Sequence, residues 1–301
     1  MNSNYYYLYS SLPEIHFNEK TDYRNLEYLF DEIMESLADS DKSAMRYIRY
    51  PLDNINLVRL LEGKPDFENN FLSGGNYTFD ELKREVKSMD TLPVYMRQFL
   101  ELFNQLQVSF ERANQFDQLN EFFYSEILST EANSDEFQET LSSGESSHDF
   151  IKRWYTFERD FNNVLTAIEC LQHNEPVERR ETIRIDQRFG QRLSGDYEIT
   201  ESLRQSKSYD YSLSGIFPWM TKVLNLKFEN IYEHEKQIVL IQMEVLDEMV
   251  GENIFSLDAL CAYFIKLGIL IRWSSLDETI GRNFVDNLSK TVMSSIYGNN
   301  R

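Results

Sequence analysis

A continuous helical pattern of apolar residues is the feature that most constrains the fold of this chain. Between Tyr95 and Ile127 an apolar side chain recurs at every third or fourth position, which places these side chains along one face of a helix. The positions are Tyr95, Phe99, Leu102, Leu106, Phe110, Ala113, Phe116, Leu119, Phe123 and Ile127. A second stripe comprises Phe150, Trp154, Phe157, Phe161, Val164, Ile168 and Leu171. Steps that alternate between three and four are typical of antiparallel helices packed along their length.

The same periodicity predicts an all-α protein. We expect helices over 24–38, 43–62, 78–88, 94–129, 148–173, 187–206, 222–250, 255–272 and 276–296. Thr78-x-x-Glu81 and Ser275-x-x-Glu278 have the form of a capping box, which marks the start of a helix. Strand signals are few: the aromatic run Tyr5–Tyr9 could be extended, and the alternation over 181–186 is ambiguous. The expected architecture is a large assembly of mostly antiparallel helices.

The loops indicate how the chain is organised into domains. The connections at 63–77, 130–147 and 174–186 are too short to be clear linkers between domains. A chain of 301 residues can bury roughly three quarters of its unfolded surface, so it needs neither a disulfide nor a metal to fold. We therefore expect residues 1–301 to form a single helical domain, divisible into two or three repeated helical units at about 20–130, 148–210 and 213–301.

A short sequence pattern that occurs twice in the chain is the basis for expecting repeated units. Asp53 and Asn56 form an Asp-x-x-Asn pair on one expected helix, and Asp160 and Asn163 form another, 107 residues later. Asp and Asn are unusual inside helices because their side chains compete for backbone hydrogen bonds. A spacing of three places both members of a pair on one helix face. The two Asp-x-x-Asn pairs reflect either a duplicated helical unit or a chance match. No third copy of the pattern is evident near 228–231.

Charge excludes some classes of function. The net charge is −20, which argues against binding to nucleic acid and against adsorption to an anionic membrane surface. The distribution is uneven: residues 101–150 hold eleven acids and one arginine, a net charge of −10. A segment with an excess of positive charge, 179–192, is rich in arginine and contains Arg179, Arg180, Arg184, Arg188 and Arg192. These arginines either pair with acidic helices of this chain or bind an external acidic partner.

Catalytic motifs are absent from the sequence. Ser73-Gly74-Gly75-Asn76 lacks the Lys-Ser/Thr of a phosphate-binding loop and is interpreted as a turn. His234-Glu235 is followed by Ile238 where a zinc protease has its second histidine. A helical di-iron site needs two Glu-x-x-His motifs, and the chain has one, at 145–148. The sequence thus predicts no catalytic residue, no cofactor-binding residue and no metal ligand.

The cysteines and the hydropathy pattern bear on the cellular compartment. Cys170 and Cys261 form no Cys-x-x-Cys motif, so a reducing compartment is the simpler interpretation. His173 follows Cys170 by three residues, but without a third orienting group the pair is weak evidence for a thiol nucleophile. No signal peptide is recognisable, and the most apolar stretch, 259–271, is too short to cross a bilayer and contains a lysine. We expect a soluble, cytoplasmic protein.

Three stretches of sequence form a recognisable set. The chain opens with Tyr5-Tyr-x-Leu-x-x-Ser-Leu-Pro13, and the two Asp-x-x-Asn helices follow, the first led by Tyr50-Pro51-Leu52 and the second preceded by Trp154. The third stretch runs from Phe255 to Leu267 and continues with Ile271-Arg-Trp273 and Leu276-Asp277-x-x-x-Gly281. Together they resemble an uncharacterised bacterial family that is encoded beside V-type ATP synthase subunits.

The resemblance carries a set of functional expectations. Such proteins are similar to the rotor cap of the V-type ATPase (its C-type component, d-type in eukaryotes), which is all-helical, built from repeated units and located between the central stalk and the membrane ring. The resemblance implies a non-catalytic coupling protein without cofactors, with V-type ATP synthase subunits as protein partners. It also implies a cytoplasmic position, peripheral to the inner face of the cell membrane. The alternatives are a helical hydrolase or metal-dependent enzyme with an unrecognised site, and a general helical adaptor.

Overall fold

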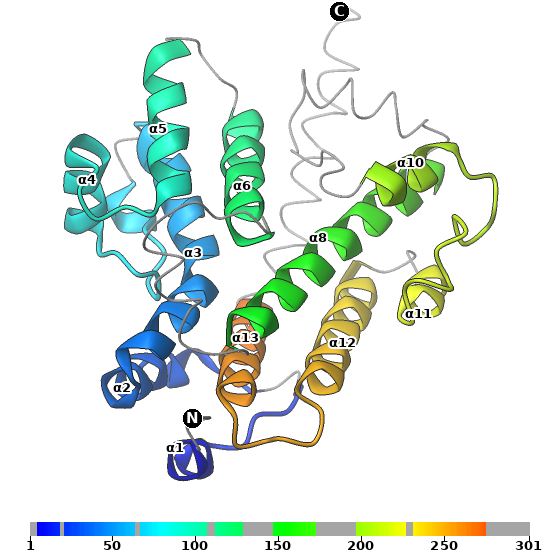
Figure 1. The fold of residues 1–301 in the computed structure, drawn as a ribbon, viewed down its shortest axis with the longest axis horizontal. Helices are drawn as coiled ribbons and strands as arrows, with labels where there is room; N and C mark the ends of the chain where they lie inside the picture. The colour runs from blue at the N-terminus through cyan, green and yellow to red at the C-terminus, as the bar shows by residue number, and fades with distance from the viewer. Residues whose placement is uncertain are drawn as a thin grey trace, which may run out of the picture.

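The described part of the chain is entirely helical. The computed structural model, drawn in Figure 1, describes residues 5–18, 21–63, 67–106, 112–128, 147–172, 197–226 and 231–274. Its α-helices are α1 (Tyr6–Ser11), α2 (Leu29–Ser36), α3 (Asp39–Leu61), α4 (Phe79–Ser88), α5 (Val94–Leu106), α6 (Arg112–Leu128), α8 (Ser147–Gln172), α10 (Tyr197–Gln205), α11 (Met220–Leu224), α12 (Ile231–Val250) and α13 (Leu257–Ser274). The described residues also contain two short 3-10 helices, η1 (Arg24–Leu26) and η2 (Glu68–Asn70). The all-α prediction is confirmed.

Three of the predicted helices are wrong in length. The helix predicted over 24–38 is shorter, because residues 24–26 form the 3-10 helix η1 and α2 runs from Leu29 to Ser36. Residues 94–129 form not one helix but two, α5 and α6, which run side by side in opposite directions (Figure 1). The apolar spacing continues across the reversal because both helices bury one face, and no glycine or proline marks the break. The predicted helix 222–250 is likewise divided, since α11 ends at Leu224 and α12 begins at Ile231.

The N-terminal end also differs from prediction. The aromatic run Tyr5–Tyr9 is not extended, because α1 begins at Tyr6 and the Tyr9 amide donates to the Tyr5 carbonyl at 2.9 Å. Aromatic residues fit strands only where a neighbouring strand is present, and the described part of the chain contains none. The ambiguous run 181–186, the helix predicted over 276–296 and the capping box at Ser275 lie outside the described residues.

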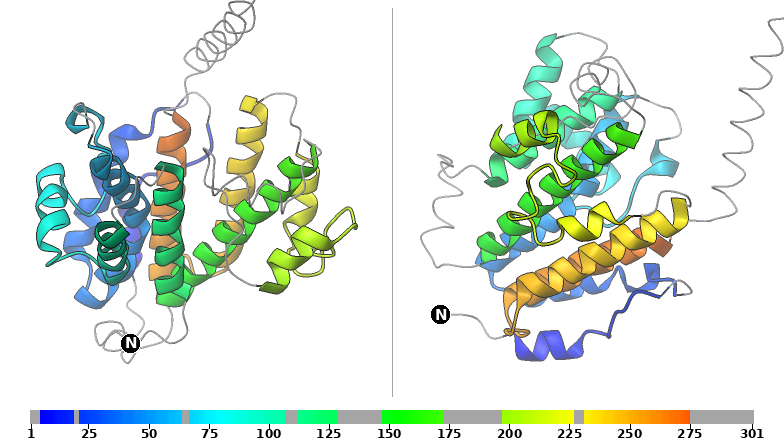
Figure 2. Two further views of the ribbon diagram at one scale, coloured as in Figure 1. Left: turned by 90° about the horizontal axis from the view of Figure 1, so that it is seen from above. Right: turned by 90° about the vertical axis from the view of Figure 1, so that its right-hand side faces the viewer.

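Helix α13 is the central element of the fold. It is apolar around most of its circumference, which is the pattern of a helix buried on all sides, and it packs against α3, α8 and α12 (Figures 1 and 2). The N-terminal segment lies along it: the Tyr263 hydroxyl donates to the Pro13 carbonyl at 3.0 Å, and the Ser274 hydroxyl donates to the Thr21 carbonyl at 3.1 Å. Neither α13 nor any other described helix has both the length and the hydrophobicity to span a bilayer.

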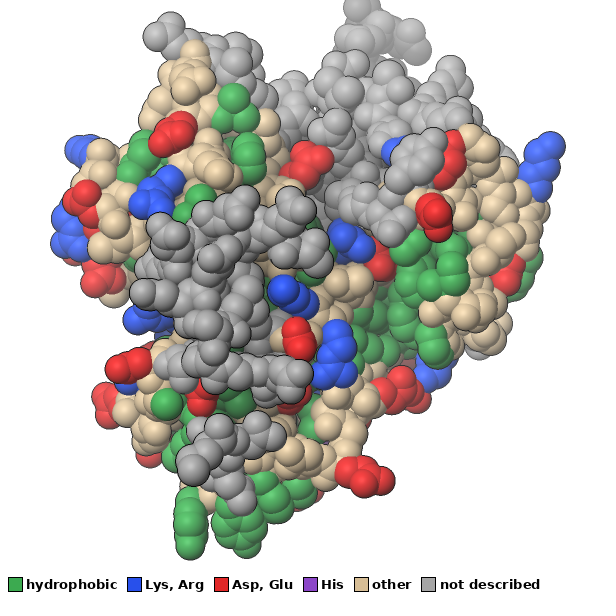
Figure 3. Space-filling view, in the orientation of Figure 1, with side chains coloured by type: hydrophobic (Ala, Val, Ile, Leu, Met, Phe, Trp, Pro, Cys, Tyr) green, Lys and Arg blue, Asp and Glu red, His purple; other side chains and the backbone are tan. Residues whose placement is uncertain are grey.

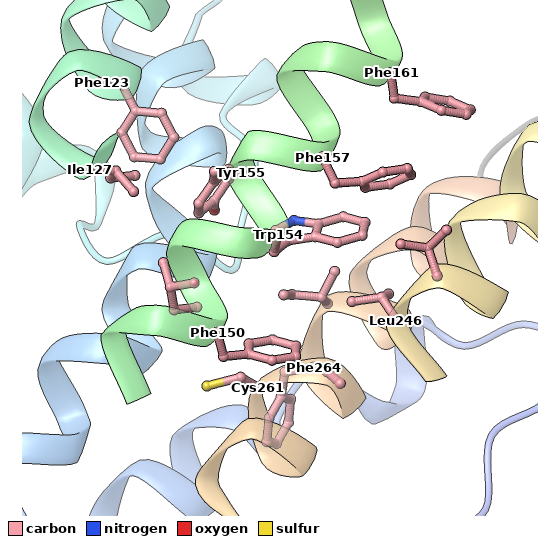
Figure 4. Close-up of a cluster of buried hydrophobic side chains, with 14 of the residues drawn as sticks. Phe123, Ile127, Phe150, Trp154, Tyr155, Phe157, Phe161, Leu246, Cys261 and Phe264 are labelled. Atoms are coloured by element: carbon pink, nitrogen blue, oxygen red, sulfur yellow. The ribbon is translucent and has the colours of Figure 1, made fainter. Parts of the chain in front are cut away.

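The stripe predicted on α8 forms a second layer of the core. Its side chains from Phe150 to Ile168 are buried. Figure 4 shows Phe150, Trp154, Phe157 and Phe161 on the side of α8 that faces α12 and α13, and Tyr155 on the side that faces α6. The Tyr155 ring packs edge-on against Phe123 of α6, with 5.0 Å between ring centroids. Phe161 meets the Trp219 ring in the same geometry at 5.4 Å. Helix α8 therefore joins two groups of helices that are far apart in sequence.

A proline inside α3 determines how α8 joins α3. Pro51 has no backbone N–H, so the carbonyl of Tyr47, four residues earlier, lacks its helical donor. The hydroxyl of Tyr155, on α8, donates to this carbonyl at 2.7 Å. Tyr155 is buried, whereas Tyr47 is half-buried. The hydrogen bond fixes one turn of α8 against one turn of α3.

The Tyr155 hydrogen bond predicts a specific double-mutant cycle. Tyr155→Phe removes this hydrogen bond and should lower the free energy of unfolding by about 0.5–1.5 kcal/mol, measured by urea denaturation. In a Pro51→Ala background the backbone N–H of residue 51 can satisfy Tyr47, so the same substitution should cost less than half as much. An equal cost in both backgrounds would contradict the role assigned to the proline.

Candidate functional site: the Asp-x-x-Asn helices

The first Asp-x-x-Asn pair binds a segment that follows α3. The Asn56 side chain donates to the Leu72 carbonyl at 2.9 Å and accepts from the Leu72 amide at 3.0 Å. The Asp53 carboxylate accepts from the amide and the side chain of Asn76, at 3.0 and 2.8 Å, and from the Tyr77 amide at 3.3 Å. Both Asp53 and Asn56 are fully buried. The spacing of three thus directs both side chains to one segment, 72–77.

The two glycines of this segment allow its close approach to α3. A Cβ atom on Gly75 would overlap Oδ1 of Asp53, so only glycine lets the chain pass at this distance. Gly74 has a φ of +87°, in the region that favours glycine, and a Cβ there would overlap the Glu27 carboxylate. The turn predicted at 73–76 is confirmed. The segment ends at Thr78, whose predicted capping box with Glu81 starts α4 and is also confirmed.

A third polar side chain, which the sequence reasoning missed, extends this contact to two more helices. Asn54 accepts a hydrogen bond from the Tyr95 hydroxyl on α5 at 2.7 Å and donates to the side chain of Asn120 on α6 at 3.3 Å. The available signal was a second polar residue directly after Asp53, in a helix interior where such residues are unusual. Asp53, Asn54 and Asn56 together form a buried polar cluster that connects α3 to the 72–77 segment, α5 and α6.

Burial alters the acidity of the Asp53 carboxyl. Desolvation raises its pKa to about 6, although the hydrogen bonds from Asn76 and Tyr77 and the charge of Arg49 act in the opposite direction. The oxygens of the carboxylate accept from the chain's own amides. This geometry is that of a side chain that holds a loop in place.

The second pair has a different electrostatic environment. Asp160 and Asn163 are buried on α8, as Asp53 and Asn56 are on α3. Asp160 forms an ion pair with its neighbour Arg159, at 2.9 Å between Nη2 and Oδ1, and both side chains are largely buried. The donors to Asp53, by contrast, are neutral amides. The two pairs share their burial in a long core helix, and their origin by duplication stays a prediction.

The family of this chain is shown by a match that spans nearly all of it. The model of a family described as a protein of unknown function (DUF2764) matches residues 1–292. The chain belongs to the DUF2764 family. No curated protein and no solved structure matches it. Both Asp-x-x-Asn helices lie within the matched residues.

The other candidate residues of this DUF2764 protein contribute no site that the structure describes. The arginine-rich segment 179–192, with Arg179, Arg180, Arg184, Arg188 and Arg192, lies outside the described residues, as does His173. Cys261 is buried, and desolvation raises the pKa of its thiol well above the ordinary value, so it is a packing residue (Figure 4). Within the described ranges, no group of three or more His, Cys, Asp or Glu residues is placed to hold a metal ion.

A second carboxyl with altered acidity lies on α8 and was also missed from the sequence. Burial raises the pKa of Glu158 to about 7, while Arg272 and a hydrogen bond with Tyr124 lower it. Nothing in the spacing of residues distinguishes Glu158 from the many other acids of the chain, because the shift depends on the helices that cover it.

Substitution of Gly75 tests the close approach of the 72–77 segment to α3. Gly75→Ala should lower the free energy of unfolding by about 2–3 kcal/mol, because the new methyl group displaces the segment from Asp53. Gly215→Ala is the matched control: a Cβ atom at Gly215 meets no atom within 4 Å, so its effect should stay within about 0.5 kcal/mol. Equal effects of the two substitutions in urea denaturation would contradict the assigned contact.

The raised pKa of Asp53 predicts a specific pH dependence. Because its folded-state pKa of about 6 exceeds the ordinary value of 3.8, protonation favours the folded state, and this contribution is lost as the pH rises through about 6. Relative to Asp53→Asn, the unfolding free energy of the wild type should therefore fall by up to about 3 kcal/mol between about pH 4 and pH 7. Asp80→Asn, at an exposed carboxyl, controls for the change in net charge. A constant difference between wild type and Asp53→Asn would refute the shift.

Proposed function

We propose that this DUF2764 protein is a non-catalytic coupling subunit of a V-type rotary ATP synthase. Its position is that of a cap between the central stalk and the membrane ring, held by protein–protein contacts and peripheral to the inner face of the cell membrane. The proposal originates in the resemblance of the opening motif, the Asp-x-x-Asn helices and the 255–281 stretch to proteins encoded beside such subunits.

The observation that best supports the proposal is the set of buried hydrogen bonds that join the long helices to one another and to the 72–77 segment. A cap that transmits torque must keep its helices in one arrangement under load. Packed interiors deform little, and buried hydrogen bonds favour one arrangement because any other leaves polar groups unsatisfied. Asp53, Asn54 and Asn56 connect α3 to three other elements, and Tyr155 joins α3 to α8. These hydrogen bonds suit a rigid protein that connects two other components.

The charge of the chain supports partners that are proteins. A net charge of −20 disfavours contact with nucleic acid and with anionic lipid headgroups. A cap beside a membrane ring with this charge would contact protein loops of the ring and the lower end of the stalk. The arginine-rich segment 179–192 is the part of the sequence best suited to an acidic surface on such a partner.

Co-purification from the native cell tests the assignment. An affinity-tagged chain, isolated in mild detergent, should recover the central-stalk and ring subunits of a V-type ATP synthase in stoichiometric amounts. Mass spectrometry identifies them, and the tag on an unrelated acidic protein is the control. Recovery of the chain without these subunits would contradict the cap assignment and favour a general helical adaptor.

A charge-reversed variant, Arg184→Glu with Arg188→Glu, extends this test to the arginine-rich segment. If the segment meets an acidic partner, co-purification should be lost while the unfolding free energy stays constant. If it pairs with the chain's own acidic helices, the unfolding free energy should fall instead. No change in either measurement would remove the segment from the interface.

A further inference from the structure

Exposed tyrosine and isoleucine side chains gather at one end of the molecule. Tyr6, Tyr7 and Ile254 are among the large hydrophobic side chains that remain exposed, and Tyr7 is 86% exposed. They belong to α1 and to the turn between α12 and α13, which lie together at the lower edge of Figure 1. The space-filling view in Figure 3 shows hydrophobic side chains grouped at that edge. We call Tyr6, Tyr7, Tyr9, Ile254 and Phe255 the tyrosine patch.

The tyrosine patch is held in a fixed geometry. The Tyr5 amide donates to the Phe255 carbonyl at 3.0 Å, which anchors α1 to the turn before α13. The Phe255 ring then contacts Tyr6 and Tyr9, with ring centroids 4.6 and 6.1 Å away, and Tyr6 meets Tyr7 edge-on at 5.5 Å. Aromatic side chains fixed in this way lose little conformational entropy on binding, which makes them effective anchors for a partner.

Acidic side chains surround the tyrosine patch. Asp41 accepts a hydrogen bond from the Tyr5 hydroxyl, and Glu252 is exposed two residues before Ile254. Burial raises the pKa of the Tyr9 phenol, and the negative charge of nearby Asp247 raises it further. The nearby lysines are paired with acids, Lys42 with Asp39 at 3.1 Å and Lys266 with Asp247, so Asp41 and Glu252 are the acids beside the patch that belong to neither ion pair. The rim of the patch therefore carries net negative charge.

We propose that the tyrosine patch is a docking surface for a basic, amphipathic segment of another protein. Apolar residues of the segment would pack on Ile254 and on the tyrosine rings. Its lysines and arginines would meet the ring faces through cation–π contacts and the rim through Asp41 and Glu252. The proposal stands on the patch and its rim, and does not depend on membership of a rotary ATP synthase.

The charge of the rim also selects between possible occupants. A second copy of this chain would bring two acidic rims together in a protein whose net charge is −20, which opposes association. An anionic membrane would be repelled in the same way. A basic protein segment is the occupant for which both the aromatic centre and the acidic rim are favourable.

The test measures binding of a defined probe to the purified full chain. The probe is a fluorescent helical peptide with lysine on one face and leucine on the other, and a glutamate–leucine peptide is its counterpart. The patch variant is Tyr7→Ser with Ile254→Ser. The control variant is Tyr209→Ser with Ile216→Ser, at sites 73% and 60% exposed that lie on another part of the surface. All four substituted side chains are exposed, so circular dichroism should show both variants folded.

The patch variant should bind the lysine–leucine peptide about tenfold more weakly than the wild type, whereas the control variant should stay within about twofold. The glutamate–leucine peptide should bind no form of the protein. Equal affinities of the two variants would overturn the proposal, since binding would then reflect only the overall negative charge. The proposal is also overturned if the wild type dimerises in sedimentation and the patch variant does not. Patch-dependent binding to vesicles of phosphatidylglycerol would likewise overturn it.

Discussion

The hydrogen bond from Tyr155 to the carbonyl of Tyr47 is the contact on which the arrangement of the long helices depends. Pro51 removes the donor that this carbonyl would have in a regular helix. The Tyr155 hydroxyl of α8 supplies a donor instead, and this contact joins one turn of α8 to one turn of α3. The apolar stripe of α8 then faces α12 and α13, and α13 is enclosed from several sides.

The buried Asp and Asn residues of α3 extend this arrangement to the rest of the chain. Each of them accepts or donates hydrogen bonds across an interface, to the 72–77 segment, to α5 or to α6. A helix interface made only of apolar side chains tolerates small sliding movements, whereas buried hydrogen bonds do not. The chain thus combines large aromatic contact areas with a few polar contacts that specify position. That combination suits a part that connects moving components without deforming itself, as the proposed role in a rotary ATP synthase requires.

Different stretches of the chain carry different chemistry. The net charge of −20 disfavours partners that carry phosphate. The tyrosine patch is a place where apolar rings and acidic side chains occur together, and a basic protein segment satisfies both. The arginine-rich segment 179–192, which lies outside the described residues, has the opposite charge in the sequence, and its pairing with acidic helices of this chain or with an acidic partner stays a prediction.

Local periodicity in the sequence determined the helical class, the burial of the α8 stripe, the capping box of α4 and the turn at 73–76, because these depend on residues within a few positions of one another. It also identified Asp53, Asn56, Asp160 and Asn163 as polar residues in helix interiors. Only the tertiary structure decided that the stripe from Tyr95 to Ile127 is divided between two antiparallel helices, and that α1 is helical. The roles of Asn54, Tyr155 and Glu158 were decided there too. The partners of these three residues lie 34 to 114 positions away in sequence, and whether a distant partner is within reach depends on packing, which local patterns do not encode.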